Sequence, residues 1–396
     1  MASSKKAAQG TKAVQNKKKA SKRQRQKRKL IILGMEVLCL LILLGVLYAW
    51  SLWNQISVEP DMSDSEAGIN EDLGDDTLLT LEGYTNIALF GLDNRTDGEY
   101  DKGMSDVIMI ASINNETKEV KLLSVYRDTY LSIGSSKFTK ANAAYANGGA
   151  KQAVRMLNTN LDLNIKEYAC VDWMAVTEAV DALGGVTIEV TKPEVEYINY
   201  GVNEMNMKLK TNSPYLQQSG VVRLNGVQAT SYARIRKLAG NDFMRSSRQR
   251  IVLEAMLTEA KKADLKTLIN ICNACFDDIS TSLSLDEIIG LARHVKEYKI
   301  VSTTGFPFTM TTKMLSGSGD TVIPIDMKSN VTKLHEFLFD ATSYQPSKTI
   351  EAIHDAIIQK TGVKENYQSI DVEDFNNTAG QTGTIFKDNE STETED

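Results

Sequence analysis

Residues 85–128 read TNIALFGLDNRTDGEYDKGMSDVIMIASINNETKEVKLLSVYRD and contain the three segments that decide the fold. Residues 85–91, 107–113 and 119–126 are rich in β-forming residues and are bounded by turn signals, which predicts three strands. The polar residues 114–117 predict a short turn between the second and third strands. If these strands form an antiparallel meander, neighbouring strands run in opposite directions.

Charged residues stand at the ends of these three strands. Asp93 follows the first strand, Asp106 precedes the second, and Arg127 and Asp128 follow the third. In a meander, all of these places lie at one end of the sheet. The convergence weakens if the first two strands are not neighbours.

A second charged group lies more than 100 residues further along the chain, where YARIRK carries Arg234 and Arg236. The segment NDFMRSSRQR then opens a predicted helix over residues 243–262, with Asp242 as a plausible N-cap. On that helix Arg245, Arg248 and Gln249 follow i, i+3, i+4 spacing and share one face.

Together these residue types indicate a metal-bound diphosphate. Carboxylates such as Asp93 and Asp106 hold hard divalent cations, and guanidinium groups bind phosphate oxygens in a bidentate fork. Each residue also has a simpler interpretation: an aspartate after a strand is usually a turn residue, and the arginines of the 243–262 helix form a solvated face. Arg95 and Lys140 complete the basic set, although Lys140 alone reads as a loop lysine.

The remaining pattern mixes helices and strands. We predict a helix near 140–160, broken by glycines near 148, a strand near 166–171, a helix near 173–183, and a strand in VTIEV. Residues 192–220 are polar and irregular and predict a long loop. Later segments predict helices near 264–276, 284–297, 328–340 and 347–360, with strands near 298–304 and 321–326. The fold class is α/β, an α/β/α sandwich around a central mixed sheet.

The N-terminal residues predict a protein that is anchored in a membrane. The first 29 residues hold 12 Lys and Arg without Asp or Glu, and residues 30–53 are almost continuously apolar. We predict a cytoplasmic basic tail (1–29), one transmembrane helix (30–53), and an extracytoplasmic remainder. A cleaved signal peptide is the alternative, but the apolar run is long and lacks a clear cleavage site. The tail is expected to contact anionic membrane lipid, and no nucleic acid is expected.

Composition divides the outer part further. We predict an acidic linker (54–80), a catalytic domain (81–265), a C-terminal extension (266–362) and a disordered acidic tail (363–396). Removing 12 of the 45 basic residues leaves 33 against 51 acidic residues, a formal charge of −18 beyond the tail. The arginine groups therefore stand out against an acidic background. Four cysteines and three scattered histidines favour neither a disulfide framework, a zinc site nor a Ser-His-Asp triad.

Six ordered segments resemble the LytR-CpsA-Psr family, the wall-glycopolymer transferases of Gram-positive bacteria. They are NIALFGLDNR, SDVIMIASIN, LLSVYRDTYL, KANAAYANGG, VDALGGVTIEV and LNGVQATSYARIRKLAGNDFMRSSRQR, which span roughly residues 83–262. The order of basic tail, apolar span and outer domain matches as well. One position departs from the family pattern, because Met104 stands where an arginine commonly precedes the Ser-Asp pair.

The resemblance implies an apolar groove for a polyprenyl chain and a charged mouth for its diphosphate, in a Gram-positive type envelope. By analogy, Asp93 and Asp106 hold Mg²⁺. Arg127, with Asp128 or Asp242 as base or as a group that orients an arginine, serves catalysis. The diphosphate contacts come from Arg95, Lys140, Arg234, Arg236, Arg245, Arg248 and Gln249.

The implied reaction moves a glycopolymer, such as teichoic acid or capsule, from a polyprenyl diphosphate carrier to peptidoglycan through a phosphodiester. One alternative is a polyprenyl diphosphate pyrophosphatase, which needs the same metal and arginines but uses water as acceptor. The other is a membrane-bound regulator or binding module without catalysis. Against this second alternative, the basic tail contains no DNA-reading module.

Overall fold

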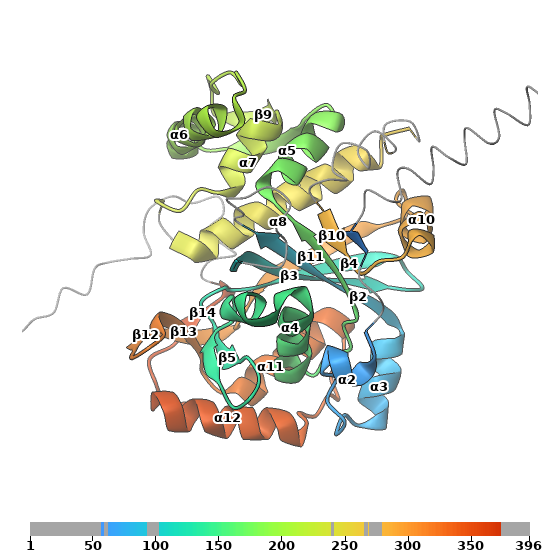
Figure 1. Ribbon diagram of the computed structural model, residues 1–396, viewed down its shortest axis with the longest axis vertical. Helices are drawn as coiled ribbons and strands as arrows, with labels where there is room; N and C mark the ends of the chain where they lie inside the picture. The colour runs from blue at the N-terminus through green and yellow to red at the C-terminus, as the bar shows by residue number, and fades with distance from the viewer. Residues whose placement is uncertain are drawn as a thin grey trace, which may run out of the picture. The chain divides into compact units, whose positions relative to one another are not determined.

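The computed structural model describes residues 57–58, 62–92, 103–238, 241–264, 268 and 279–373. Within these ranges, a seven-stranded mixed sheet lies between two layers of helices (Figure 1). One layer contains α5, α6, α7 and α8, and the other contains α2, α3, α4, α11 and α12. The predicted mixed α/β fold with a central sheet is confirmed.

The strand order of the central sheet is β1-β10-β7-β2-β3-β4-β11. Strands β2, β3 and β4 are antiparallel neighbours, whereas β7 runs parallel to β2, and β11 runs parallel to β4. The bounds are Ser57–Val58 (β1), Tyr84–Leu92 (β2), Ser105–Asn114 (β3), Glu119–Val125 (β4), Glu167–Val171 (β7), Ile279–Thr281 (β10) and Lys299–Phe306 (β11).

The predicted meander is therefore confirmed, and the register brings the charged strand ends together. Leu92 at the end of β2 pairs with Ser105 at the start of β3, so Asp106 lies at that edge. Ser124, near the end of β4, pairs with Met109 of β3. Because β4 ends at the same edge, Arg127 and Asp128 follow directly beside Asp106.

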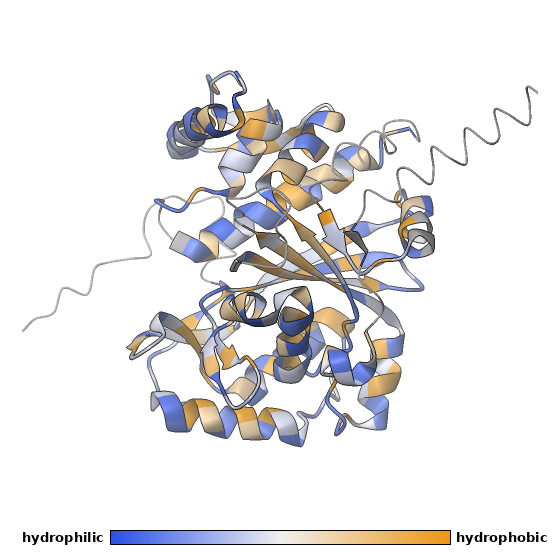
Figure 2. Ribbon diagram, in the orientation of Figure 1, coloured by the Kyte–Doolittle hydropathy of each residue, from blue (hydrophilic) through white to orange (hydrophobic). Residues whose placement is uncertain are grey.

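The layer that contains α4 encloses the larger core. Its helices are α2 (Asp64–Ala67), α3 (Asp75–Glu82), α4 (Ala143–Leu161), α11 (Met327–Phe339) and α12 (Lys348–Thr361). Apolar side chains from these helices and from one face of the sheet pack into one cluster that includes Phe90, Tyr145 and Leu334. Figure 2 shows hydrophobic stretches along these helices and along the central strands. Helix α4 kinks at Gly148 and Gly149, where the sequence predicted a break. Small sheets β5-β6 (Tyr130–Ser132, Phe138–Lys140) and β13-β12-β14 (Gly319–Pro324, Thr309–Leu315, Ile370–Asp371) complete this layer.

The opposite layer carries most of the second charged group. It contains α5 (Trp173–Ala182), α6 (Lys192–Leu209), α7 (Gly226–Ala233), α8 (Asn241–Ala260) and the strand pair β8 (Val186–Val190) and β9 (Gly220–Leu224). Val180, Ile198 and Val252 belong to its apolar core. Helix α8 also packs on the central sheet through Leu253, which contacts a cluster around Met109.

The prediction of a long loop over residues 192–220 is wrong for its first two thirds, because residues 192–209 form α6. Thr191 and Glu194 make a capping box at its start, and Pro193 occupies the first turn. Ile198, Val202 and Met205 are buried at i, i+4, i+7 spacing. The many Asn and Glu residues on the exposed face obscured this apolar stripe in the sequence.

Within the predicted C-terminal extension over 266–362, the described residues are integrated with the rest of the outer domain. Strands β10 and β11 belong to the central sheet, and α11 and α12 contribute to the main core. The predictions included no strand at β12. Helix α10 (Leu285–Arg293) follows β10.

The predicted acidic linker (54–80) is helical in part. Residues 64–67 form α2, and residues 75–82, which extend two positions beyond the predicted linker, form α3. Ala67 and Leu81 from these helices are buried in the main core. Among the residues that the structure describes, no helix is long and apolar enough to cross a membrane. Residues 1–53, including the predicted span over 30–53, lie outside the described ranges, as do most of 264–276 and of the predicted tail.

Candidate active site

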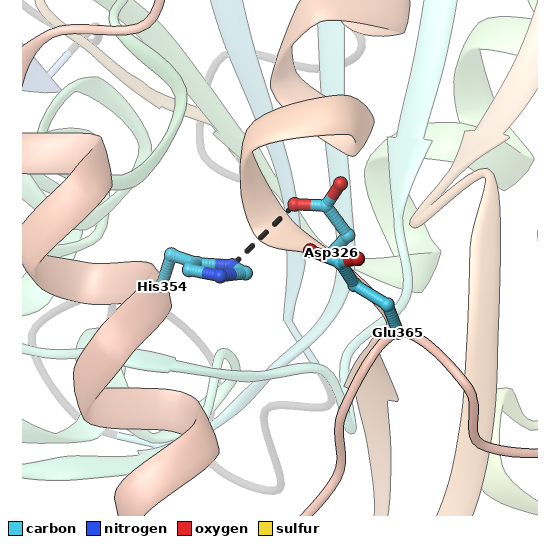
Figure 3. A group of neighbouring side chains, drawn as sticks. All are labelled: Asp326, His354 and Glu365. Carbon is cyan, nitrogen blue, oxygen red and sulfur yellow. Dashed lines mark ion pairs between the residues drawn. The ribbon is translucent and has the colours of Figure 1, made fainter.

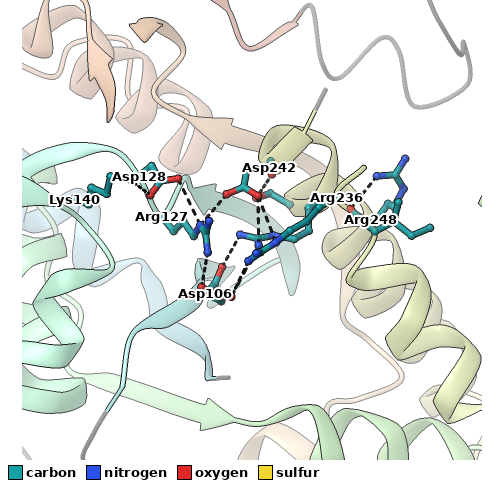
Figure 4. A network of polar contacts seen from close by, with 10 residues as sticks. Asp106, Arg127, Asp128, Lys140, Arg236, Asp242 and Arg248 are labelled. Carbon is teal, nitrogen blue, oxygen red and sulfur yellow. Dashed lines mark hydrogen bonds and ion pairs between the residues drawn. The ribbon is translucent and has the colours of Figure 1, made fainter. Parts of the chain in front are cut away.

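Five charged side chains from four segments meet at the edge of the sheet (Figure 4). Asp106 comes from β3, Arg127 directly follows β4, and Arg236 lies between α7 and α8. Asp242 and Arg245 come from the first turns of α8. The sequence predicted that these groups would share one site, and the structure brings them together.

Asp106 and Asp242 are bridged by arginines. Nη1 of Arg127 donates to Oδ1 of Asp106 at 2.7 Å, while its Nε donates to Oδ2 of Asp242 at 2.8 Å. Nη2 of Arg236 donates to Oδ2 of Asp106 at 2.8 Å, and its Nε lies 3.7 Å from Oδ1 of Asp242. Nη1 of Arg245 lies 3.4 Å from the same Asp242 oxygen. Three guanidinium groups therefore share two carboxylates, and the cluster carries a net positive charge.

The electrostatics of the cluster shift the pKa values of Asp106, Arg127 and Arg245. Burial by itself would raise the pKa of Asp106, but the hydrogen bond from Arg127 and the neighbouring guanidinium charges outweigh it and hold that pKa below its ordinary value. Burial lowers the pKa of Arg245 to about 10, although Asp242 opposes this shift. Burial also acts to lower the pKa of Arg127, but Asp242, Asp106 and Asp128 raise it overall.

Asp128 and Lys140 form an adjoining pair. Nζ of Lys140 lies 3.0 Å from Oδ1 of Asp128, and the other Asp128 oxygen lies 3.5 Å from Nε of Arg127. Lys140 is thus tied to the cluster through Asp128, rather than being a free loop lysine. Asp128 is placed to orient Arg127.

Arg234 lies on the wall of a polar pocket beside the cluster. Its guanidinium carbon stands 5.4 Å from the ring centre of Trp173, and its Nη2 lies 3.5 Å from Oε1 of Glu204. The pocket encloses about 230 Å³ and is lined also by Asp106, Arg236 and Arg245. One charged cavity is therefore lined by Arg234 and by two of the cluster arginines, Arg236 and Arg245.

A second, almost wholly apolar pocket lies between the sheet and helices α5 and α8. It encloses about 320 Å³, a size typical of ligand sites, and is lined by side chains that include Leu89, Val107, Ala179 and Val252. Trp173 lines both pockets, and the neighbouring residues Asp106 and Val107 of β3 line one pocket each. The charged cavity and the apolar pocket therefore adjoin.

Buried donors without partners lie around this junction. Within the described residues, Nε of Arg245, Nε2 of Gln249 and Nε1 of Trp173 are all buried and donate to no acceptor. Gln249 belongs to the apolar pocket and Arg245 to the charged cavity. Because buried donors are usually satisfied, these three N–H groups mark a place where a ligand supplies acceptors.

Arg248 does not join the cluster, in contrast to the prediction that it supports the phosphates. Its Nε donates to Oε1 of Glu194 on α6 at 2.8 Å, and its Nη1 donates to the carbonyl of Ile235 at 3.4 Å. Its side chain is 5% exposed. Arg250 is buried too and donates to Oγ of Ser124. The alternative of a solvated arginine face on this helix is therefore wrong.

Other predictions have different outcomes. Asp93 and Arg95 lie outside the described residues. Asp242 is not the N-cap, because α8 already begins at Asn241 and the Asp242 carboxylate contacts arginines instead. Met104, which stands where an arginine is common in the family, is 55% exposed.

Sequence reasoning missed the aromatic and acidic lining of the charged cavity. Trp173 begins α5, while Tyr197, Tyr200 and Glu204 lie on α6. Residues 192–220 were expected to form a loop, so Tyr197, Tyr200 and Glu204 had no predicted place near the arginines. The spacing of Tyr197, Tyr200 and Glu204 at i, i+3, i+7 on one helix face is the signal that was available.

Comparison with known proteins identifies the family of this chain. The model of the LytR_cpsA_psr family matches residues 59–338, which is well over half of the chain. The chain belongs to this family. The match extends on both sides of the segment 83–262 that carried the resemblance, in agreement with the integration of β10, β11 and α11 into the domain.

Curated relatives share the family and carry a function in their names. The polyisoprenyl-teichoic acid–peptidoglycan teichoic acid transferase TagU of Bacillus licheniformis is 27% identical over 282 residues, which cover 70% of this chain and 85% of the relative. TagU of Enterococcus faecalis is 32% identical over 213 residues, covering 52% of this chain and 64% of the relative.

Solved structures show the same fold. The structure of TagT bound to LI-WTA has a TM-score of 0.55 and 21% identity, and the match covers 73% of this chain and all of that chain. A TagT structure with bound octaprenyl pyrophosphate lipid has a TM-score of 0.50 at 20% identity, with 72% of this chain and 99% of that chain covered.

Proposed function

We propose that this protein transfers a teichoic-acid-type glycopolymer from a polyprenyl diphosphate carrier to peptidoglycan and forms a phosphodiester bond. The observation that carries this proposal is the junction of an arginine-rich cavity with an apolar pocket at Trp173 and at the Asp106–Val107 step. The names of the TagU relatives describe a reaction with the same kind of substrate.

The two pockets match the two halves of such a donor. The prenyl chain lies in the apolar pocket between the sheet and α8, where burial of its methyl and methylene groups supplies binding energy. The diphosphate lies among Arg127, Arg236 and Arg245, whose charge exceeds that of the two carboxylates they share. Arg234 lines the charged cavity that also contains Arg236 and Arg245. In the proposed complex, a phosphate oxygen accepts from Nε of Arg245, which has no partner among the described residues.

The donor set also fits Mg²⁺. Asp106 offers hard carboxylate oxygens, and its lowered pKa keeps it ionised. Both oxygens accept from arginines in the present arrangement, and each keeps a second lone pair that can coordinate the ion. We assign Asp106 and Asp93 as the residues that hold Mg²⁺, which when bound neutralises charge on the diphosphate.

In the proposed reaction, an acceptor hydroxyl attacks the phosphorus that carries the glycopolymer. The bond from that phosphorus to the bridging oxygen breaks, and polyprenyl phosphate leaves with the bonding electron pair and takes up the proton that the hydroxyl releases. Such a transfer depends mainly on positioning and on charge stabilisation by fixed donors such as Arg127. Both candidate bases, Asp128 and Asp242, contact Arg127, which fits a role in orienting that arginine.

The setting of the reaction follows from the sequence. We assign residues 30–53 as a membrane anchor, with the basic tail in the cytoplasm and the catalytic domain outside, where polyprenyl-linked polymers and peptidoglycan meet. The diphosphate bond carries the energy of the reaction, so no nucleotide is required.

Product analysis tests the proposal. The full-length protein, purified in detergent, is incubated with Mg²⁺ and a short-chain prenyl-diphosphate-linked sugar, with and without peptidoglycan fragments. Mass spectrometry should detect a phosphodiester-linked glycan only when the fragments are present, and Arg127→Ala should abolish it. Sugar phosphate without attachment would indicate the pyrophosphatase, and no product from a folded protein would favour a regulator or binding module.

A further inference from the structure

A separate group of metal-ligating side chains lies in the layer opposite α8. Asp326 precedes α11, His354 lies on α12, and Glu365 follows α12 (Figure 3). One ligand atom from each residue lies within 4.8 Å of the other two. The three side chains converge from separate segments, and none of them takes part in the cluster around Asp106.

Asp326 stands where a helix-capping aspartate is expected, but its carboxylate does not cap. It occupies the N-cap position of the 13-residue helix α11, and it makes no side-chain cap hydrogen bond. An N-cap aspartate ordinarily accepts from the backbone of the first turn. Instead, Oδ1 is buried and accepts no hydrogen bond from any described residue. A buried carboxylate oxygen without a donor calls for a positive partner.

His354 faces that oxygen from α12. Its side chain is only 8% exposed, and Nδ1 lies 3.4 Å from Oδ1 of Asp326. That approach gives no hydrogen bond, and no other hydrogen bond joins the ring of His354 to the described part of the chain. A buried imidazole and a partly exposed carboxylate with one buried oxygen therefore face each other without a hydrogen bond between them.

The spacing is the one expected for two ligands of a common ion. Ligand atoms about 2.1 Å from a tetrahedral cation lie about 3.4 Å apart. Glu365 is exposed and closes the third side, which leaves a fourth position open to water. One imidazole nitrogen with carboxylate oxygens suits Zn²⁺ better than Mg²⁺, which prefers oxygen ligands alone.

We propose that Asp326, His354 and Glu365 form a Zn²⁺ site that is distinct from the transfer site. Zinc bound there joins the start of α11, the middle of α12 and the turn after α12, and it gives the buried Asp326 oxygen a positive partner. This role is structural, because the three ligands come from three separate segments of this layer.

Zinc binding by the full-length protein tests this proposal. The protein is stripped with a chelator and dialysed, and ZnCl₂ is then titrated while zinc content and the midpoint of thermal unfolding are measured. Glu365→Gln is the main variant because its side chain is exposed, so the fold tolerates the change. Asp355→Asn, an exposed neighbour of His354 on α12, is the matched control. Asp106→Asn separates this site from the transfer site.

The wild-type protein should bind Zn²⁺ at this site and unfold at a higher temperature when Zn²⁺ is present. Glu365→Gln should bind Zn²⁺ at least about tenfold more weakly, whereas Asp355→Asn and Asp106→Asn should keep the stabilisation. His354→Gln should lose it as well, if that variant folds. The proposal is overturned if Zn²⁺ leaves the wild-type unfolding temperature unchanged, or if Glu365→Gln responds to Zn²⁺ as the wild type does.

Discussion

Two arginines one turn apart on α8 have different surroundings and different roles. Arg245 shares Asp106 and Asp242 with two other arginines, and its Nε has no partner among the described residues. Arg248 is equally buried but pairs with Glu194 on α6 and with a backbone carbonyl. An arginine with unused donors in a cavity can serve a ligand, whereas an arginine whose donors are used locally holds elements together.

The same contrast separates the two regions as a whole. The cluster around Asp106 has more positive than negative groups and opens into a cavity, so it has charge left for a diphosphate. The pair beneath α6 is neutral and closed. Its Glu194 also serves the capping box of α6, because Oε2 accepts from the backbone and hydroxyl of Thr191.

The largest expected effect follows the loss of Arg127. Arg127→Ala removes the donor that bridges Asp106 and Asp242, so we expect kcat/KM for transfer to fall by at least about 10³-fold. The free energy of unfolding should change little, because the site is partly exposed. Steady-state kinetics and urea unfolding measure both quantities. A folded variant with wild-type activity would contradict this assignment.

The opposite result is expected when the buried pair is broken. Arg248→Met leaves one oxygen of Glu194 buried without its partner, which should lower the free energy of unfolding by about 3 kcal/mol. The folded fraction should keep its transfer activity. The double variant Arg248→Met/Glu194→Gln should recover much of the stability, since glutamine can still cap α6. Unchanged stability with lost transfer would show that Arg248 serves the substrate after all.

A smaller effect is expected from filling the apolar pocket. Ala179→Phe projects a ring into the space between the sheet and α5, so long prenyl chains should bind less well. KM for a long-chain donor should rise about tenfold, which corresponds to about 1.4 kcal/mol. A donor with a very short chain is the control and should be used almost as well as by the wild type. An equal rise in KM for both donors would show that the apolar pocket does not bind the prenyl chain.

The smallest effect concerns pH. The folded-state pKa of Asp106 lies below its ordinary value, so its ionised form contributes stability above the unfolded pKa, and this contribution is lost as the pH falls through the folded pKa. The stability difference between the wild type and Asp106→Asn should therefore be full at neutral pH and shrink under acid conditions. Urea unfolding at several pH values measures it. A stability difference between the two proteins that grows as the pH falls would contradict this prediction.

Much of this site could be predicted from local patterns. Strand signals around residues 85–126 and the placement of Asp106 and Arg127 at strand ends were sufficient, because an antiparallel meander returns the chain to the same edge. Helical spacing placed Arg245, Arg248 and Gln249 on one face but could not distinguish them. Their partners come from α6 and β3, and these tertiary contacts have no local signature.

The parts that could not be predicted share a physical cause. Helix α6 carries a narrow apolar stripe among many polar residues, so its pattern was weaker than the packing that stabilises it. Strands β10 and β11 add to the central sheet across more than 100 residues of chain, and strand pairing at that distance leaves no periodic mark. Alternation within a strand indicates burial but does not identify the neighbouring strand.

The most direct test of the account is a binding cycle that varies ligand and protein together. Octaprenyl diphosphate and octaprenyl monophosphate are titrated into the wild type and Arg127→Ala in the presence of Mg²⁺. If Arg127 contacts the diphosphate, loss of one phosphate should weaken binding to the wild type much more than to the variant, giving a coupling of about 1 kcal/mol or more. Equal losses in both proteins would show that the cluster around Asp106 does not hold the diphosphate, and would contradict the central claim.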